Sequence, residues 1–423
     1  MPTRLLAIGD IHLGRTLRRL PDGLDPARLG PAAALRAAVA AARSLRVSAV
    51  LLAGDVADQE HDLYHAHGVL TEVLGALGRD GIPVLAVAGN HDHETLPRLA
   101  RALPDLQILG RGGAWETVTV QGDGGPVDVL GWSFPGPHHP ASPALGLTRV
   151  TSGRPTLGLL HADLDTAGSR YAPVRAHELQ AAGPVRWLLG HIHQPSLDPD
   201  HDHPGYLGSL VGLQPNETGP RGPWLVSVEP DRIELEHLAQ APLRWERLDV
   251  TVDHLAEPRI ELAAAVAESL REFAALNADD LGQVEAVGVR INLVGRAADH
   301  AGLVQAAAEL GREPFCVVSD DLTLFVDAIT SEARPTHDLA ALAERDDPPG
   351  LLARDLLDLA AGTAPALLAE ARRELARVDL QGAFVSLAGR DHDDASLTAR
   401  LLEAGYRVLD TLLASRKDGH GAA

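Results

Sequence analysis

The chain has 423 residues, of which 45% are hydrophobic and 22% charged, so it is long enough for two or three domains with cores of their own. A formal net charge of −21 argues against autonomous binding of extended nucleic acid, and the single cysteine, Cys316, excludes an internal disulfide and a thiolate metal site. No apolar run reaches the roughly 18 residues of a membrane helix, and no signal peptide fits before the first predicted strand, so we expect a cytoplasmic protein without a membrane partner.

The N-terminal part of the chain alternates short apolar runs with amphipathic segments, as strands connected by helices do. Strands are predicted over residues 4–8, 47–53 and 82–88, and helices over residues 31–45, 63–77 and 96–103. Pro31 occupies the first turn of its helix, where proline is favoured. This β-α-β-α-β alternation predicts a mostly parallel sheet.

The middle of the chain changes to strands with few helices between them. Residues 115–120 and 127–132 alternate apolar and polar side chains around a glycine-rich turn, which predicts a β-hairpin. Further strands are predicted over residues 157–160, 185–189, 207–213, 224–228 and 233–238. The last three of these are expected to be antiparallel and to close a second sheet.

The remaining residues predict a small α+β domain followed by helices. In the segment 241–332, a helix face and an alternating strand are indicated by the residues Leu262, Val266, Leu270, Phe273, Val287, Val289, Ile291 and Leu293. Residues 315–318 and 322–326 could pair, and Cys316 is expected to be a small core residue. Leucine stripes predict helices over residues 333–414, and residues 415–423 are expected to be a disordered tail.

Polar residues of metal-ligand type follow five of the apolar runs, which is the most informative pattern in the chain. They are Asp10, His12, Asp55, Asn90, His161, His191 and His193. The carboxyl ends of strands are where ligands collect in open α/β sheets. A set of oxygen and nitrogen donors without cysteine suits a pair of divalent metals, which can activate a water and clamp the phosphoryl oxygens of an in-line displacement.

Each candidate ligand has an expected place. Asp55 follows a central strand and is the natural bridge between two metals. Asp10 and His12 are two residues apart, as are His191 and His193, so each pair converges only if the backbone bends. Either one histidine of each pair serves each metal, or the turns direct both inward.

His91, directly after Asn90, is the candidate general acid, with Asp92 holding its ring in the required tautomer. The alternatives are that His91 only orients a metal ligand and that Asp92 is a structural partner. Asp58 either faces the site or begins a helix as its N-cap. Arg221 either meets a phosphate or is an ordinary surface arginine.

The ordered motifs resemble the signature of calcineurin-like metallophosphoesterases over residues 1–240. These motifs are Gly9-Asp10-x-His12, Gly54-Asp55, Gly89-Asn90-His91-Asp92, His161 and Gly190-His191-x-His193. Within this superfamily, His12-Leu13-Gly14 and the segment 217–222 are similar to SbcD-type DNA repair exonucleases, the nuclease subunits of double-strand-break repair complexes.

The resemblance implies a four-layer α-β-β-α sandwich over residues 1–240, a cap domain over 241–332 and partner-docking helices over 333–414. It implies that one metal is held by Asp10, His12, Asp55 and His193, and the other by Asp55, Asn90, His161 and His191. By resemblance, the metal is Mn²⁺, His91 is the acid and the reaction is phosphodiester hydrolysis in DNA, as an exonuclease or endonuclease. The implied partner is an SbcC-type coiled-coil ATPase, and the implied assembly is a homodimer.

Two other functions fit the same motifs. The acidic charge favours a phosphodiesterase or phosphatase for small substrates. A non-catalytic scaffold of a DNA-end complex is the third hypothesis, although the complete ligand set argues against it. The residues that contact the substrate, the polarity of cleavage and the physiological metal are not indicated by the sequence.

Overall fold

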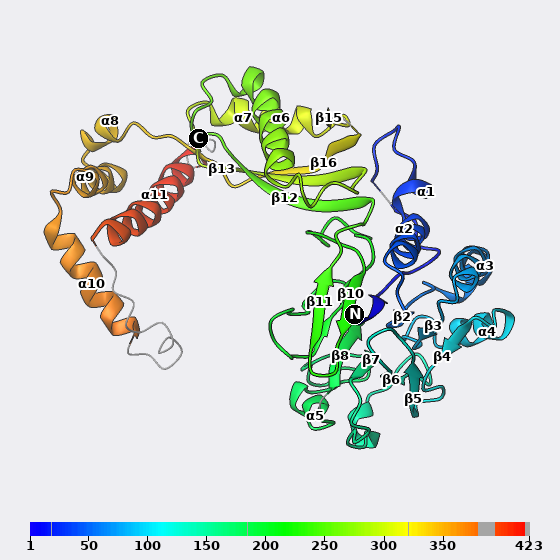
Figure 1. Cartoon of the computed structure of the whole chain (residues 1–423). Coiled ribbons are helices and arrows are strands. Elements are labelled where there is room, and N and C mark those ends of the chain that lie inside the picture. The colour runs from blue at the N-terminus through cyan, green and yellow to red at the C-terminus, as the bar shows by residue number, and fades with distance from the viewer. Residues whose placement is uncertain (18, 184, 320, 380–393, 419–423) are drawn as a thin grey trace. The chain divides into compact units, whose positions relative to one another are not determined.

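A computed structural model describes residues 1–17, 19–183, 185–319, 321–379 and 394–418 (Figure 1). The predicted mixed α/β class is confirmed, with parallel and antiparallel sheets and with helices. The chain forms two compact units, the first of which comprises Met1–Val250, Ala263–Asn292 and Ala308–Thr330. The second comprises Thr251–Leu262, Leu293–Ala307 and the described part of Ser331–Ala423. The domain boundaries given above stay predictions.

The first sheet of unit 1 carries the N-terminal ligand motifs, and its strand order is β11-β10-β1-β2-β3-β4. Its strands are β1 (Thr3–Ile8), β2 (Ala49–Leu52), β3 (Val84–Ala86), β4 (Leu106–Ile108), β10 (Trp224–Val228) and β11 (Ile233–His237). The strands β1 to β4 are parallel, as the alternation of strands and helices predicts.

The strands β10 and β11 were predicted to close the second sheet, and this prediction was wrong. They are antiparallel strands, but they extend the first sheet because β10 pairs with β1, from Thr3 opposite Val228 to Ala7 opposite Trp224. In this register Trp224, Val226 and Val228 are buried between the two sheets. Apolar alternation in the sequence marks a strand but does not select its neighbour, which explains the error.

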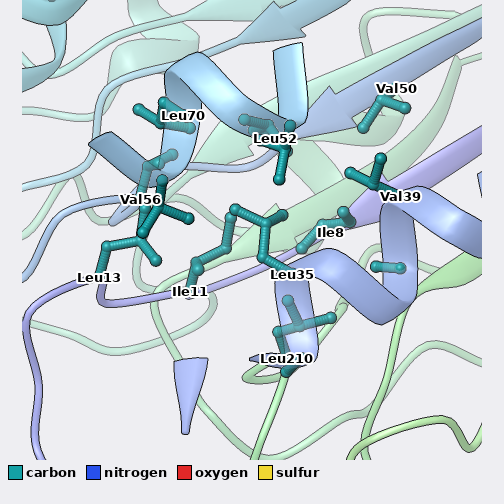
Figure 2. Close-up of a cluster of buried hydrophobic side chains, with 14 of the residues drawn as sticks. Ile8, Ile11, Leu13, Leu35, Val39, Val50, Leu52, Val56, Leu70 and Leu210 are labelled. Atoms are coloured by element: carbon teal, nitrogen blue, oxygen red, sulfur yellow. The ribbon is translucent and has the colours of Figure 1, made fainter. Parts of the chain in front are cut away.

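Helices cover the outer face of the first sheet. They are α1 (Pro26–Leu29), α2 (Pro31–Ser44), the 3₁₀ helix η1 (Glu60–Asp62), α3 (Leu63–Arg79) and α4 (Thr95–Ala102). Figure 2 shows Leu35 of α2 and Leu70 of α3 in one buried cluster with Ile8 and Leu52 of the strands. Ile11, Leu13 and Val56, which stand beside the predicted ligands, belong to the same cluster and anchor the ligand-bearing turns.

The second sheet has the order β5-β6-β7-β8-β9. Its strands are β5 (Trp115–Val120), β6 (Val127–Trp132), β7 (Thr156–His161), β8 (Val185–Gly190) and β9 (Gly205–Tyr206). The predicted hairpin is confirmed, with Trp115 opposite Trp132. The strand predicted over residues 207–213 is wrong, because only Gly205–Tyr206 pairs with β8, and in parallel.

Both sheets share one core. Leu51 of β2 and Val87, which follows β3, lie in one buried cluster with Val129 and Leu159 of the second sheet. On its other face, the second sheet contributes Trp187 to a cluster with α5 (Ala176–Gln180), while the 3₁₀ helix η2 (Pro143–Gly146) lies in a connecting loop. Packing of apolar faces against each other is typical of layered α/β domains, and the four-layer arrangement stays a prediction.

A third sheet has the order β12-β13-β16-β15, from β12 (Leu243–Thr251), β13 (Ala286–Val294), β15 (Cys316–Ser319) and β16 (Leu322–Ser331). The predicted pairing of the last two strands is confirmed. The predicted helix is α6 (Pro258–Leu276), on which Leu262, Val266 and Leu270 are buried. Cys316 is exposed rather than in the core, because the alternation along β15 buries its neighbour Val317 instead.

In unit 2, β14 (Arg296–Ala297) pairs with β17 (Arg334–Pro335). The helices are α7 (His300–Leu310), whose first residues belong to this unit, α8 (Leu339–Ala343), α9 (Pro348–Ala360), α10 (Pro365–Asp379) and α11 (Asp394–Asp418). Residues 333–414 are therefore largely helical where the structure describes them. Leu356 of α9 and Leu409 of α11 are buried.

The helix α11 continues through Asp418 and so includes the first four residues of the tail expected over residues 415–423, whereas the last five of these residues lie outside the described part of the chain. The first glycine after Gly405 is Gly419, so the sequence has no helix-breaking residue at 415. Within the described part of the chain, no helix has both the length and the apolar character needed to cross a membrane.

Candidate metal centre

The seven predicted ligands lie at or just beyond the carboxyl ends of strands from two sheets. Asp10 and His12 follow β1, Asp55 follows β2 and Asn90 follows β3. In the second sheet, His161 is the last residue of β7, whereas His191 and His193 follow β8. Asp10, His12, Asp55 and His161 are at most 2% exposed, so the centre is buried.

The backbone bends that the ligand spacing requires are present. Positive φ angles occur at Asp10 (33°), His12 (53°), Asp55 (50°) and His191 (103°). Non-glycine residues rarely adopt this conformation, which costs of order 1–3 kcal/mol each and is retained mainly at functional sites. Gly190 sits so close to the β2 end that a Cβ atom there would lie 2.1 Å from the carbonyl oxygen of Ala53.

His12 and His193 form a first group of donors with Asp10. The Nε2 atoms of His12 and His193 are 3.0 Å apart. Single ligand atoms of these two histidines and Asp10 all lie within 4.8 Å of one another. The Asp55 Oδ2 atom is 3.8 Å from His12 Nε2, so this carboxylate adjoins the group.

His161 is the centre of a second group. Its Nε2 atom lies 3.1 Å from Asn90 Oδ1, 3.3 Å from His191 Nδ1 and 3.4 Å from Asp55 Oδ2. His191 and His193 therefore diverge, one toward each group. Of the two arrangements left open by the sequence, the structure has one histidine of this pair in each group. The same Asp55 oxygen adjoins both.

Each of the four histidines has a second ring nitrogen that is not part of a donor group, which we call its outer nitrogen. An oxygen atom lies close to each outer nitrogen. His12 Nδ1 is 2.8 Å from Asp58 Oδ1, and His161 Nδ1 is 3.0 Å from the Ala53 carbonyl. In the same way, His193 Nδ1 is 2.9 Å from Glu217 Oε1, whereas His191 Nε2 makes an ion-pair contact with Asp163 Oδ1 at 3.2 Å. Acceptors at these positions place the ring proton outside and direct the lone pair of the other nitrogen inward, as in metal-bound histidines.

This donor set fits two divalent cations. Imidazole nitrogens and carboxylate or amide oxygens are ligands for transition metals, and inward lone pairs a few ångströms apart would repel one another without a cation between them. Asp55 adjoins both groups and therefore fits the role of a bridge. Manganese is not distinguished from other divalent metals by these contacts, and the individual ligand assignments stay predictions.

The electrostatics of the centre favour positive charge. Burial opposes an imidazolium at His161, yet the Asp55 and Asp10 carboxylates outweigh it and raise the pKa of His161 to about 9. Although burial acts in the opposite direction, the same His161 charge holds the pKa of Asp55 well below its usual range. Burial raises the pKa of Asp10. The field that retains a proton on His161 would equally attract a metal ion.

His91 is exposed beside the buried ligands. Its Nδ1 atom is 3.0 Å from the carbonyl oxygen of Asp58, which can only accept, so this nitrogen carries a proton. The backbone N–H of His91 donates to Asp55 Oδ1 at 3.0 Å, and its ring centroid is 5.2 Å from that of His12. When the ring is charged, its second proton is on Nε2, which is the geometry that a proton donor requires.

The predicted role of Asp92 in orienting His91 was wrong. The buried Asp92 carboxylate accepts from the backbone N–H of Gly89 and of Val56, both at 2.7 Å, whereas the Asp58 carbonyl orients His91. These bonds tie the β2 and β3 turns together. Burial and the nearby Asp55 charge raise the pKa of Asp92 to about 7. Asp92 is therefore structural in these contacts rather than catalytic.

Sequence reasoning missed two residues of the centre, Asp163 and Glu217, and left Asp58 open. Asp163 could have been suggested by its spacing of two residues from His161. Glu217 is separated from His193 by 23 residues, so only its place in the 217–222 motif marked it. Neither interpretation of Arg221 holds, because this arginine is 1% exposed and donates to the backbone carbonyls of His193 and Thr218.

Comparison with known proteins agrees with this geometry. Residues 3–195 match the family model of the calcineurin-like phosphoesterases. The predicted resemblance to this superfamily is therefore supported for this segment, which is less than half of the chain. An uncharacterized metallophosphoesterase of Bacillus subtilis is 27% identical over 234 residues, which cover 52% of this chain. The match spans 55% of that relative, so the chain covers only about half of its length.

Two solved structures that match this chain share little sequence with it. A dimetal phosphatase from Danio rerio has 16% identity and a TM-score of 0.37, and the match covers 56% of this chain and 96% of the phosphatase. A protein from Thermus thermophilus has 15% identity and a TM-score of 0.35, with 56% of this chain and 99% of that protein covered.

Replacing Asp92 by alanine should lower the stability of the phosphoesterase domain. Two buried N–H groups, those of Gly89 and Val56, would lose their acceptor. At about 1–3 kcal/mol for each unsatisfied group, we expect the free energy of unfolding to fall by about 2–6 kcal/mol, measured by urea denaturation. Asp231→Ala, in an exposed turn, is the control. Equal stability of the two variants would contradict the structural role.

Metal binding near neutral pH should release protons. Metal-bound imidazole is neutral, whereas the carboxylates raise the pKa of His161 to about 9, and the Glu217 hydrogen bond raises that of His193 despite its burial. Apparent Mn²⁺ affinity should therefore rise with pH until His161 is neutral. Calorimetric titrations in buffers of different ionisation enthalpy measure the release, which should shrink above the pKa of His161. Heats independent of buffer near neutrality would contradict the prediction.

Proposed function

We propose that the protein is a metal-dependent phosphodiesterase that cleaves DNA. In this proposal one ion is held by Asp10, His12, Asp55 and His193, and the other by Asp55, Asn90, His161 and His191. The observation that carries it is the pair of donor groups that share Asp55 Oδ2, with the exposed ring of His91 beside them. Such an arrangement is suited to phosphoester hydrolysis.

The residues divide the chemistry between them. Two bound ions would supply an activated water and neutralise charge on the phosphoryl oxygens. His91 is held through Nδ1 by the Asp58 carbonyl, so its Nε2 atom can deliver a proton to the leaving oxygen. When the ions are bound, the outer acceptors of the four histidines would hold the remaining ring protons outside, so that the inner nitrogens can serve as ligands.

DNA as the substrate is supported by residues near the centre. A cavity of about 410 Å³ has Gly14 in its lining, two residues after His12, and its charged or titratable lining residues are Arg15, Arg36, Asp62 and His65. Arg15 is half-buried, and its guanidinium lies 3.8 Å from Asp58, the partner of His12. Arg36 is paired with Glu72, so Arg15 is the lining arginine nearest in sequence to the ligands that could meet a further phosphate, although the chain as a whole has a charge of −21. The His12-Leu13-Gly14 resemblance favours the same substrate.

The proposed partner is an SbcC-type ATPase, which could contribute the basic surface that this chain lacks. Unit 2 offers helices for docking, on which Leu351, Leu357 and Val408 are exposed. Mn²⁺ as the metal, a homodimer as the assembly and exonuclease action at DNA breaks belong to the same proposal. They rest on the resemblance of the motifs rather than on contacts in the structure.

Hydrolysis of small phosphoesters is the second candidate. The acidic charge favours it, because a small substrate needs no extended basic surface. The two functions share the metal centre, so they differ only in what the surroundings of the centre bind.

Purified protein should degrade end-labelled DNA in the presence of Mn²⁺ and not in the presence of a chelator. A denaturing gel with single- and double-stranded substrates, with and without the candidate ATPase, measures this. A chromogenic small diester, bis-para-nitrophenyl phosphate, is assayed in parallel. If the small diester is hydrolysed and DNA is never cut under any of these conditions, the second candidate replaces the first. If neither is hydrolysed, a scaffold role is favoured.

His91→Leu should retain the metals and lose turnover, whereas Asp55→Ala should lose the metals. Loss of a general acid typically costs about 10²–10⁴-fold in rate. Metal content is measured by elemental analysis after desalting, and rates are measured with either substrate. His67→Leu, on the exposed side of α3, is the matched control and should behave like the parent. Metal loss in His91→Leu would make this residue a ligand instead.

A further inference from the structure

Glu217 is a buried carboxylate whose two oxygens are fully used. It lies in the loop between β9 and β10 and is 8% exposed. Its Oε1 atom accepts from His193 Nδ1 at 2.9 Å. Its Oε2 atom accepts from the Ser209 hydroxyl at 3.2 Å and from the Leu213 backbone N–H at 2.9 Å. The carboxylate is therefore held in one orientation, and so is the imidazole that it contacts.

The same loop holds the backbone of His193. The carbonyl oxygen of His193 accepts hydrogen bonds from the buried guanidinium of Arg221 and from the Ser209 backbone N–H, the latter at 2.9 Å. Arg221 also donates to the Gln194 side chain at 2.8 Å. With both the ring and the carbonyl fixed, His193 Nε2 has a defined position, 3.0 Å from His12 Nε2.

Trp245 of β12 forms two hydrogen bonds with this loop. Its indole N–H donates to the Gly212 carbonyl at 3.0 Å, and its backbone carbonyl accepts from the Gly219 N–H at 2.9 Å. These two bonds lie on either side of Glu217 in the sequence. The side chain is 1% exposed, so its bonds are shielded from water.

The third sheet fixes Trp245 in turn. The indole packs edge-to-face on Phe325 of β16, with ring centroids 5.5 Å apart. Gly288 of β13 leaves the space that the indole fills, because a Cβ atom there would lie 2.1 Å from the ring. All of these residues belong to unit 1. A continuous series of contacts thus connects three strands of this sheet to His193.

We infer that Glu217 is a positioning residue for the metal ligand His193, and that Trp245 makes this positioning depend on the third sheet. The inference rests on the proposed metal centre but not on DNA as the substrate. By accepting a hydrogen bond from the Nδ1–H group of His193, Glu217 leaves the Nε2 lone pair available to an ion. A displacement of β12 would move the loop 212–219 and with it the carboxylate. The ion held by His12 and His193 is therefore the one affected.

The first test measures Mn²⁺ affinity of the full chain by calorimetry for Glu217→Gln and Glu217→Asp. Losing an acceptor of this kind typically costs 10–100-fold in metal affinity, and we expect about a 10-fold loss or more for one ion and a smaller change for the other. Glu178→Gln is the matched control, because Glu178 also accepts from a serine hydroxyl and a backbone N–H but contacts no predicted ligand. Thermal unfolding in chelator shows whether each variant is folded.

The second test is a double-mutant cycle in the same affinity. Trp245→Phe removes the bond to Gly212 and should weaken Mn²⁺ binding several-fold in the parent but much less in Glu217→Gln, because both changes act through one loop. The control is Trp115→Phe. Trp115 lies on β5, and its indole N–H donates to the Pro143 carbonyl at 3.0 Å.

Unchanged affinity in both folded Glu217 variants would overturn the role of Glu217, and additive effects in the cycle would overturn that of Trp245. A parent protein that binds no Mn²⁺ would overturn both this inference and the proposed centre. A parent that binds Mn²⁺ without cutting DNA would overturn only the proposed substrate, and the affinities of the variants would still decide the inference.

Discussion

The centre depends on the hydrogen bonds and the one ion-pair contact that the outer nitrogens of its four histidines make. Each acceptor, Asp58, the Ala53 carbonyl, Asp163 or Glu217, keeps one ring proton outside and one lone pair inside. An imidazole free to flip would present a proton to the neighbouring ligand half of the time and would repel a cation. The acceptors come from segments that are distant in the sequence, so the preorganised site is a property of the folded domain rather than of its motifs alone.

Strain at the ligand positions has a compensating source of stability. Positive φ angles at Asp10, His12 and Asp55 are unfavourable, yet the turns that contain them are hydrogen-bonded to each other, with the His12 N–H donating to the Asp55 carbonyl at 2.9 Å. Ile11 and Val56 extend from the same turns into the buried cluster under α2 and α3. Burial of such side chains contributes roughly 1.5–3 kcal/mol each, comparable to the cost of the strain.

The sequence was sufficient for features that depend on neighbouring residues. Strand ends followed by Asp, His or Asn marked every predicted ligand, and hairpin chemistry marked the β5–β6 pair. It was insufficient where the chosen partner is distant. Nothing near Trp224 reveals that β10 pairs with β1, and nothing near Asp92 reveals that its acceptors face Val56 and Gly89 rather than His91. The contact between Glu217 and His193 depends on the arrangement of β8, β9 and β10, so the acceptor of His193 could not be predicted from sequence spacing.

The two ion positions are unequal in what supports them. His161 rests on the Ala53 carbonyl at the end of β2, a contact within the cores of the two sheets. His193 rests on Glu217, in a loop that Trp245 joins to the third sheet. A packed strand end has little freedom to move, whereas a loop moves more readily together with the residues that contact it. A displacement of strands in the third sheet would therefore change the ligand geometry nearer His193 first. The ligand geometry nearer His161 would stay the same. Such an asymmetry would let one ion respond to the surroundings of the phosphoesterase domain without dismantling the centre that both ions share through Asp55.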